Sequence, residues 1–212
     1  MAAPEVVREV LAEAQGQGFI GPGPLGRHVA QALRFSEVIA HVRGRALDRE
    51  DHLVDLGAGG GLPGLVLASV RTELRVSLVE GSTRRAAFLE EAVDRCGLGA
   101  RVDVVGTRAE VAGRDPELRG RCTVVTARSF GTPSETAECA APFLRVGGIL
   151  VVSEPPEPRG NAGWPVTGLA LLGLESTSST PVDPRFVLLK QASPCPDRYP
   201  RRVGVPRKRP LF

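Results

Sequence analysis

Glycines at close, regular spacing follow a short apolar run near residue 55, and residues of this kind can bind a nucleotide-like ligand. Residues 53–56 are typical of a buried strand, and residues 62–70 are apolar enough for a helix. Between them lies the pattern Asp-x-Gly-x-Gly-x-Gly, formed by Asp55, Gly57, Gly59 and Gly61. This arrangement brings backbone N–H groups and a helix N-terminus against a ligand, and glycine permits the close approach. Asp55 is placed to accept hydrogen bonds from the loop or from a ligand ammonium.

An acidic residue at the end of the next expected strand supports a nucleoside ligand. Residues 75–80 alternate in polarity and end in Glu80. A carboxylate at this strand tip suits the hydroxyls of a ribose. The same acid is expected for NAD, so Glu80 indicates an adenosine-type ligand and no more. Pro63 lacks an N–H, which fits a first helical turn better than a phosphate-binding turn. The alternative is a glycine-rich turn without a ligand.

Polar residues also follow the third and fourth expected strands. They are Arg108 and Glu110 after the third strand, and Arg128 after the fourth. In a doubly wound sheet, ligands lie outside the carboxyl ends of the strands. We therefore expect these side chains to converge with Asp55 and Glu80 on one cleft, and we predict that this cleft is the active site.

The elements that position these residues alternate between strand and helix. Such alternation predicts an α/β fold with a doubly wound, mainly parallel sheet and a final antiparallel hairpin. We expect a helical cap over 1–46, in which His28 is more often a structural than a functional residue, then a main domain over 47–196 and a basic tail over 197–212. The expected helices are 5–14, 25–41, 62–70, 82–96 and 134–144, and the expected strands are 53–56, 75–80, 102–105, 122–127, 149–153, 169–176 and 186–190.

Length and composition restrict the class of protein. At 212 residues, of which 42% are hydrophobic, the chain suffices for one well-buried domain. The start has neither a basic leader nor an apolar signal core, and the longest apolar runs, 149–152 and 169–174, are far below membrane-spanning length. The four cysteines form no Cys-x-x-Cys motif, so we expect reduced thiols and no metal site. A cytoplasmic protein without a membrane partner is expected, and a monomer, because no sizeable oligomerisation helix is visible.

Basic residues gather near the end of the sequence. The net charge of +3 is modest, and because Lys190 and Lys208 are the only lysines, the arginine richness is attributed to a GC-rich genome. Clustering remains informative, and residues 198–209 are the densest basic cluster. Its prolines favour an extended segment, and Tyr199 is available to stack on a base. Neutralisation of RNA phosphates is favoured over a solvated, arginine-biased terminus. The candidate RNA-binding residues are Arg201, Arg202, Arg207, Lys208 and Arg209.

With these positions in hand, the sequence resembles the small-subunit (16S) ribosomal RNA guanine-N7 methyltransferases, also called the glucose-inhibited division protein B family. The resemblance spans about 47–212 and, less securely, the helix that carries His28. The Leu-Pro-Gly after the glycine loop is more specific than the loop itself. The segments that carry the resemblance are Asp55-Leu-Gly-Ala-Gly-Gly-Gly-Leu-Pro-Gly64, Gly106-Thr-Arg-Ala-Glu110, Thr126-Ala-Arg-Ser-Phe130 and Pro206-Arg-Lys-Arg-Pro-Leu211.

The resemblance implies a Rossmann-like class I methyltransferase fold with a seven-stranded sheet, and S-adenosylmethionine as the cofactor of a methyltransferase domain over 47–196. It implies that Gly57 and Leu62 lie on the cofactor and that Ala109 and Glu110 border its adenine. Arg128 would lie at the methionine end and the target base, as the candidate catalytic residue. The implied partner is ribosomal RNA or the small ribosomal subunit, not DNA. The candidate cofactor-binding residues are Asp55, Gly57, Gly59, Gly61, Leu62, Glu80, Ala109, Glu110 and Arg128.

The chemistry implied by the resemblance needs little acid or base. Guanine N7 carries a free lone pair, so its attack on a sulfonium methyl needs alignment more than a general base. The absence of an obvious catalytic triad from the sequence is consistent with that. Arg128 is expected to donate to guanine O6. Methyltransferases that act on exocyclic amines carry an Asn/Asp-Pro-Pro-Tyr motif after the fourth strand. This chain has Arg128-Ser-Phe-Gly131 at that place, so amino methylation is disfavoured.

Two positions depart from the family pattern and keep alternatives open. The family usually has His-x-x-Asp-Ser-Leu in the helix before the sheet, where this chain has Gln31 and Ala32 instead of the acid and hydroxyl. A Lys-Gly pair after the fifth strand is replaced by Ser153-Glu154-Pro155-Pro156, and glutamate reverses the sign of a contact with a polyanion. A small-molecule methyltransferase and a non-catalytic cofactor- or RNA-binding paralogue are therefore alternatives. An NAD-dependent oxidoreductase is a third, which no Tyr–Lys or His–Asp pair supports.

Overall fold

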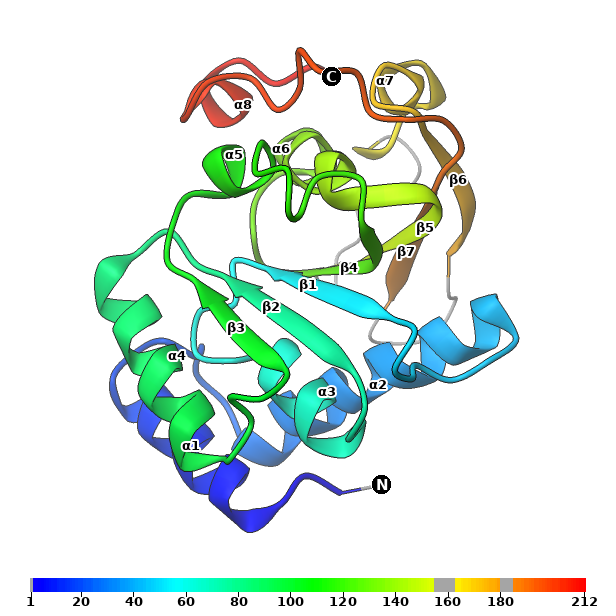
Figure 1. Cartoon of the computed structure of the whole chain (residues 1–212). Helices are drawn as coiled ribbons and strands as arrows, with labels where there is room; N and C mark the ends of the chain where they lie inside the picture. Colours follow the sequence, from blue (N-terminus) through cyan, green and yellow to red (C-terminus); the bar gives the residue numbers. More distant parts are fainter. Residues whose placement is uncertain (1, 155–162, 180–184) are drawn as a thin grey trace. The chain divides into compact units, whose positions relative to one another are not determined.

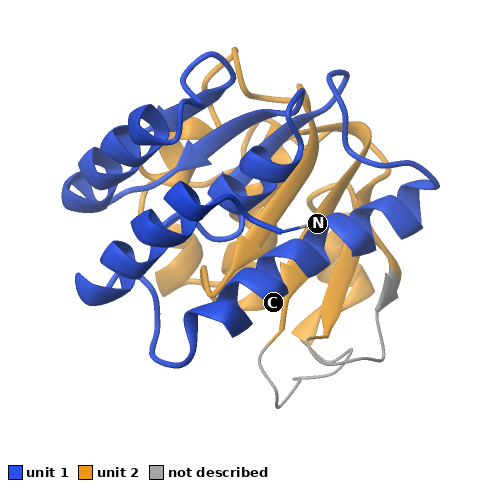
Figure 2. Ribbon diagram, turned by 90° about the horizontal axis from the view of Figure 1, so that it is seen from below, with its two compact units in different colours: residues 1–107 blue, residues 108–212 orange. Residues whose placement is uncertain are grey.

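The computed structural model describes residues 2–154, 163–179 and 185–212. Pro155 and Pro156, which replace part of the family's usual pattern, lie outside the described residues. The chain divides into two compact units, unit 1 over Met1–Thr107 and unit 2 over Arg108–Phe212, which have different colours in Figure 2.

Unit 1 contains three parallel strands in the order β3-β2-β1, with helices on one face of them (Figure 1). In the register, His52 lies opposite Arg75, and Val76 lies opposite Val102. Strand β1 is buried after its first residue, as expected for a parallel strand covered by helices. The strands are β1 (His52–Leu56), β2 (Arg75–Val79) and β3 (Val102–Val105), and the helices are α1 (Glu5–Gly16), α2 (Leu25–Arg43), α3 (Gly64–Val70) and α4 (Thr83–Arg95).

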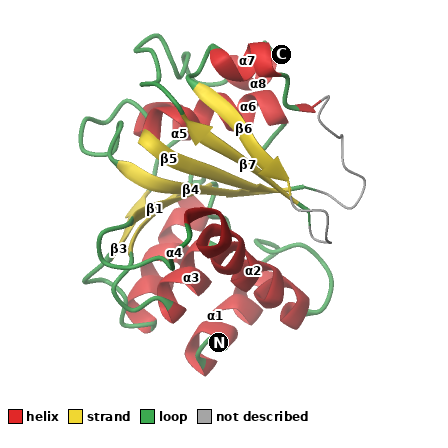
Figure 3. Ribbon diagram, turned by 90° about the vertical axis from the view of Figure 1, so that its right-hand side faces the viewer, coloured by secondary structure: helices red, strands yellow, loops and turns green. Residues whose placement is uncertain are grey.

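Unit 2 contains four strands in the order β4-β5-β7-β6, and its helices lie on one face of them (Figure 3). Strands β4 and β5 are parallel, whereas β7 is antiparallel to both β5 and β6, which confirms the closing antiparallel hairpin. The strands are β4 (Cys122–Arg128), β5 (Leu144–Ser153), β6 (Leu174–Ser179) and β7 (Phe186–Gln191), and the helices are α5 (Ala109–Ala112), α6 (Pro133–Ala140), the 3-10 turn η1 (Ala141–Phe143), α7 (Val166–Ala170) and α8 (Val205–Lys208).

Two predicted elements of unit 2 had wrong bounds, and the extended conformation predicted for the tail was wrong. The strand expected over 169–176 begins only at Leu174, because α7 precedes it and Gly173 turns the chain with φ 75°. The helix expected over 134–144 ends at Ala140, before the proline-containing turn η1. The tail is not fully extended, because α8 forms with Pro206 in its first turn, where a missing N–H costs no hydrogen bond.

A buried carboxylate, Asp51, ties α2 to the start of β1. Its Oδ1 lies 2.6 Å from Arg43 Nη2 and its Oδ2 lies 2.8 Å from Arg45 Nη1, while the side chain is fully buried. Burial alone would raise the pKa of Asp51, but hydrogen bonds from the two arginines outweigh it and lower this pKa to about 2. The folded state therefore binds this proton more weakly than the unfolded state does.

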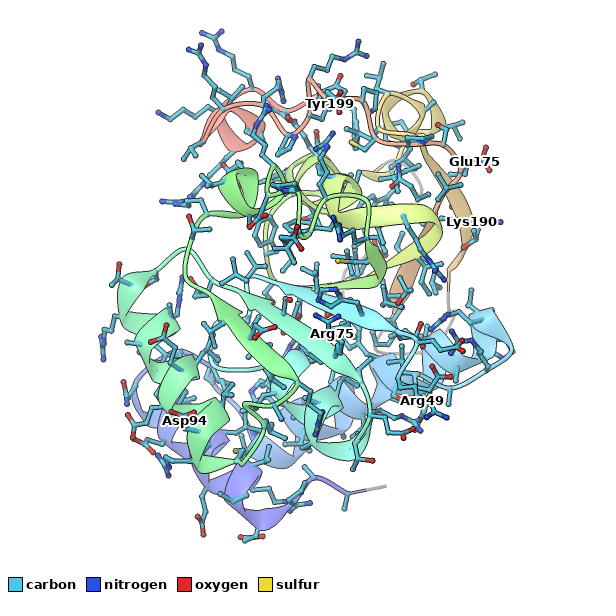
Figure 4. All side chains as sticks on the ribbon, viewed as in Figure 1. Arg49, Arg75, Asp94, Glu175, Lys190 and Tyr199 are labelled. Carbon is cyan, nitrogen blue, oxygen red and sulfur yellow. The ribbon has the colours of Figure 1, made fainter. Side chains whose placement is uncertain are left out.

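We expect the contribution of Asp51 to the free energy of unfolding to be fully present above pH 4. About 2 kcal/mol of that contribution should be lost as the pH falls from about 4 to about 2. Asp51→Asn should lower the free energy of unfolding at neutral pH by about 3 kcal/mol, because it removes the acid that pairs with the largely buried Arg43, whereas Arg45 keeps its contact with Asp48. It should also remove this part of the acid dependence. Urea unfolding at several pH values measures both effects. The control is Asp94→Asn, on the exposed end of α4 (Figure 4), and equal stability of the two variants would contradict the prediction.

Candidate functional site

The glycine loop of unit 1 has the backbone conformation that its sequence predicts. Gly57, Gly59 and Gly61 have φ values of 71°, 57° and 100°, in the region that glycine adopts without strain. The N–H groups of Gly57 and Ala58 both donate to the carbonyl of Val79, at 2.8 and 3.0 Å. The loop is therefore fixed to the end of β2, next to Glu80.

Asp55 accepts a hydrogen bond from the start of the helix that follows the loop, whereas the loop or a ligand ammonium was expected to supply the donor. Its Oδ2 lies 2.8 Å from the backbone N of Gly64, the first residue of α3, and the side chain is buried. Pro63 immediately precedes α3 and so occupies the start of the helix, as its missing N–H suggests. Asp55 thus fills the position at the helix N-terminus where a phosphate would otherwise bind.

Glu80 is buried at the tip of β2, and its side chain also bonds to the loop. Its Oε2 accepts from Gly59 N at 3.0 Å, and its Oε1 accepts from Ser82 N at 2.8 Å and from Arg85 Nη2 at 2.9 Å. A carboxylate offers about four acceptor positions, and these bonds use three of them. The side chain of Arg85 is 43% exposed and can move aside. Glu80 can therefore accept at least one further hydroxyl.

The end of α1 and the segment between α1 and α2 pack against the glycine loop, which sequence reasoning missed. A Cβ added at Gly60 would lie 2.7 Å from Ile20 Cγ1 and 3.0 Å from Ala14 Cβ. Phe19 packs edge-on against Phe88, with ring centroids 5.4 Å apart. No local signal in the sequence marks these contacts, because they join segments about 40 to 70 residues apart.

His28 is engaged in the turn that precedes α2. Its Nε2 lies 3.1 Å from the carbonyl oxygen of Gly21 and 3.2 Å from that of Pro22. These contacts support the structural role that the sequence favours for this histidine.

The candidate residues of unit 2 lie at the start of α5 and at the end of β4. Ala109 and Glu110 are buried in the first turn of α5, and Glu110 Oε1 accepts from Gly204 N at 2.8 Å. Arg128 is the last residue of β4 and is partly buried. Ser129 follows with φ 55°, and among the described residues no other non-glycine residue has a positive φ. Backbone strain of this kind is typical of functional positions, so the Arg128–Ser129 turn becomes a stronger candidate.

The basic tail presents four of its five candidate residues to solvent. Arg202, Arg207, Lys208 and Arg209 are exposed, and Figure 4 shows nitrogen-tipped side chains extending outward around α8. Arg201 instead pairs with Glu138, at 2.6 Å between Nη2 and Oε2. The expectation that Tyr199 is available to stack was wrong, because its side chain is buried, with the guanidinium of Arg198 5.1 Å from the ring centroid.

Glu154, which replaces the family's usual lysine, does not present its charge to solvent. The side chain is buried, its Oε1 accepts from Trp164 Nε1 at 3.1 Å, and its Oε2 lies 3.2 Å from Arg185 Nε. The charge of Glu154 is therefore compensated within unit 2. The expected repulsion of a polyanion at this position loses its physical basis.

The thiols of Cys139 and Cys195 are poor nucleophiles. Burial raises the pKa of Cys195 to about 11 and raises the pKa of Cys139 further. Within residues 2–154, 163–179 and 185–212, no group of three or more His, Cys, Asp or Glu side chains is arranged to hold a metal ion. In the same ranges, no helix has both the length and the apolar composition to span a membrane.

Comparison with known proteins identifies the family. The model of the family described as rRNA small subunit methyltransferase G matches residues 25–155. The ribosomal RNA small subunit methyltransferase G of Roseiflexus castenholzii is 37% identical over 176 residues, covering 78% of this chain and 73% of its own. The ribosomal RNA small subunit methyltransferase G of Pelotomaculum thermopropionicum is 32% identical over 193 residues, which cover 88% of this chain and 80% of the relative. The chain belongs to this family. The match includes the helix of His28, the glycine loop and Arg128, and the relatives extend it over most of the chain.

Solved structures show the same fold. An O-methyltransferase from Bacillus cereus, in complex with SAH, has a TM-score of 0.62 at 16% identity, covering 90% of this chain and 92% of its own. The strand order of the chain, β3-β2-β1-β4-β5-β7-β6, is that of a class I methyltransferase fold with a mainly parallel sheet, as predicted. The protein is an S-adenosylmethionine-dependent methyltransferase of the family, so the NAD-dependent oxidoreductase alternative was wrong.

Proposed function

We propose that this protein transfers the methyl group of S-adenosylmethionine to N7 of a guanine in small-subunit ribosomal RNA. The observation that carries the proposal is the family match over residues 25–155, which includes both the glycine loop and Arg128. The compensated charge of Glu154 supports it, because this departure from the family pattern no longer opposes RNA.

The residues of unit 1 fit the cofactor. Glu80 keeps an acceptor position for a ribose hydroxyl, and its bond from the Gly59 amide holds the loop in its positive-φ conformation, while Asp55 holds the amide of Gly64 at the start of α3. Gly57, Gly59, Gly61 and Leu62 are proposed to lie along the ligand. When bound, S-adenosylmethionine supplies an electrophilic methyl group on its sulfonium. By family resemblance, Ala109 and Glu110 of unit 2 are proposed to border its adenine.

The proposed transfer asks for alignment rather than proton movement. Guanine N7 has a free lone pair, so neither a general base nor a nucleophilic side chain is required. We assign Arg128 to guanine O6, where its guanidinium would orient the base without blocking N7. The four exposed basic residues of the tail would bind phosphates of the RNA.

Arg128→Ala is expected to lower kcat/KM for methyl transfer about 10- to 150-fold, which corresponds to the loss of one charged hydrogen bond to O6, about 1.5–3 kcal/mol. Arg128→Lys should recover part of the activity, because it keeps a charged donor but not the planar guanidinium that would fix the orientation of the base. Single-turnover transfer from methyl-labelled S-adenosylmethionine measures the effect. Arg121→Ala, which removes an exposed arginine of unit 2, is the control. Equal rates for Arg128→Ala and the control would exclude Arg128 from the target site.

The direct test of the proposed function incubates the protein and labelled cofactor with small ribosomal subunits from a strain that lacks this gene. Mapping by strand cleavage at N7-methylguanine should give label at one guanine. Absence of label with intact cofactor binding would contradict the proposal, and metabolite acceptors would then be screened. Binding without any turnover would indicate a non-catalytic paralogue.

We further propose a monomer that acts in the cytoplasm, where a bacterial ribosomal subunit would be its substrate. Light scattering on the purified protein should give the mass of one chain, 22.4 kDa, and a mass twice as large would contradict the monomer. Cell fractionation should place the protein in the cytoplasm, and recovery with the membranes would contradict that location.

A further inference from the structure

The C-terminal segment of unit 2 is fixed by side chains of α5 and α6. Helix α8 contacts α6, and the two lie close together in Figures 1 and 3. The backbone of the segment is also bonded at several points along its length. Segment 201–212, called the strap below, therefore has a defined conformation.

The strongest of these bonds joins Glu138 of α6 to Arg201. The carboxylate of Glu138 is fully buried, and it accepts from Arg201 Nε at 2.8 Å, from Arg201 Nη2 at 2.6 Å and from the backbone N of Arg201 at 2.8 Å. Arg201 Nη2 also donates to the carbonyl of Arg209 at 2.7 Å. One guanidinium thus connects both ends of the α8 turn to a buried acid.

Two further acceptors fix the strap between and beyond these points. Glu110 accepts from Gly204 N at 2.8 Å, just before α8. Ser134 Oγ accepts from Leu211 N at 2.8 Å and from Phe212 N at 3.3 Å. Both side chains are buried. The acceptors of α5 and α6 therefore set the path of the backbone on both sides of the exposed basic residues.

These contacts separate two roles among the tail's basic residues. Arg201 is directed inward to an acid, whereas Arg202, Arg207, Lys208 and Arg209 are exposed on the segment that it fixes. A fixed backbone brings several positive charges to one surface before a ligand arrives, which lowers the entropy cost of binding a polyanion. A loose tail with the same composition would have to lose that entropy on binding.

We infer that Glu138 is a positioning residue for RNA binding, which acts through Arg201 to hold the strap so that its four exposed basic residues form one phosphate-binding surface. This inference rests on the proposed function and adds a residue that touches neither the cofactor nor RNA. The expected change in RNA affinity on loss of Glu138 has an unusual sign. Removing a negative charge from a protein normally strengthens its binding to a polyanion, whereas loss of Glu138 should weaken it.

The test measures binding of deproteinised small-subunit ribosomal RNA as a function of salt concentration, for wild type, Glu138→Gln and Glu117→Gln. Glu117 is an exposed acid of unit 2, so its variant makes the same change in charge without a contact to the strap. Glu138→Gln is expected to lower RNA affinity about tenfold and to reduce the slope of log K against log salt by about 2, since each phosphate contact contributes roughly 0.7 to 0.9. Glu117→Gln should bind as tightly as wild type or more tightly.

Three further measurements separate positioning from general destabilisation. Hydrogen exchange at the amides of Gly204, Leu211 and Phe212 should accelerate in Glu138→Gln, while affinity for S-adenosylmethionine stays unchanged. Ser134→Ala, which changes no charge, should weaken RNA binding in the same direction but less. The triple variant Arg207→Ala/Lys208→Ala/Arg209→Ala should weaken wild type strongly and Glu138→Gln only slightly, because the effects share one surface.

Unchanged or stronger RNA binding by folded Glu138→Gln would overturn the inference, and so would full additivity with the triple variant. An unchanged salt slope in the triple variant would overturn it as well, because the strap would then not contact RNA. If Glu138→Gln fails to fold, Ser134→Ala decides, and wild-type RNA affinity in that variant overturns the inference. Failure of wild type to methylate ribosomal subunits is a separate result and would reject the proposed function.

Discussion

Replacing Glu80 by alanine is expected to raise the Kd for S-adenosylmethionine about 100-fold while unit 1 remains folded. A hydrogen bond to a carboxylate contributes about 1.5–3 kcal/mol, which is roughly 10- to 150-fold in Kd. Alanine also removes the acceptor of the Gly59 and Ser82 amides, so the loop loses its bond at Gly59 while the bonds of Gly57 and Ala58 to the carbonyl of Val79 remain. Calorimetric titration with the cofactor measures the change.

Two comparisons identify which contact of Glu80 matters. Wild type should bind S-adenosylhomocysteine more tightly than an analogue without ribose hydroxyls, whereas Glu80→Ala should bind both equally. Persistence of the wild-type preference in the variant would show that Glu80 acts on the loop and not on the ribose. Glu90→Gln, on the exposed face of α4, is the control for loss of an acid and should leave Kd unchanged.

Gly64→Ala is expected to lower the free energy of unfolding by about 3–5 kcal/mol, the sum of overpacking and a lost buried hydrogen bond. The added Cβ would lie 2.5 Å from Leu78 Cδ2 and 2.7 Å from Asp55 Oδ2, closer than atoms can pack. Asp55 would have to move, although it accepts from the amide of the same residue. Thermal and urea unfolding measure the loss.

The matched control for Gly64→Ala is Gly26→Ala. Gly26 also lies in the first turn of a helix, α2, but an added Cβ meets nothing within 4 Å. Because alanine is the better helix former, this variant should be neutral or more stable by up to about 1 kcal/mol. Equal stability of the two variants would mean that the contact between α3 and Asp55 tolerates a methyl group.

The sequence predicts the parts of this protein that depend on local pattern. Alternating strand and helix periods give the parallel strands, and the glycine spacing gives the positive φ values of the loop. Asp55 is recognisable because the strand before a glycine loop places one side chain next to the following helix. Glu80 is recognisable because it ends the next strand of the same pattern.

The parts that the sequence does not predict depend on distant partners. The sequence around Gly60 does not predict that Ile20 packs against it. The partner of Arg201 is Glu138, 63 residues earlier, so a basic cluster read from composition includes one arginine that is directed inward. The burial of Tyr199 likewise depends on residues distant in the sequence, so composition does not predict it. Helix α7 was missed because an apolar run of this length suits a strand and a short helix equally.

The hydrogen bond between Asp55 and Gly64 also bears on which metabolites can compete for this protein. A bare helix N-terminus attracts phosphate, and many nucleotide-binding loops depend on that attraction. Here a carboxylate already occupies the amide, so a pyrophosphate brought to the start of α3 would meet negative charge. S-adenosylmethionine carries no phosphate and does not meet this repulsion. The start of α3 is therefore a poor site for a phosphate group, which fits a cofactor that carries none.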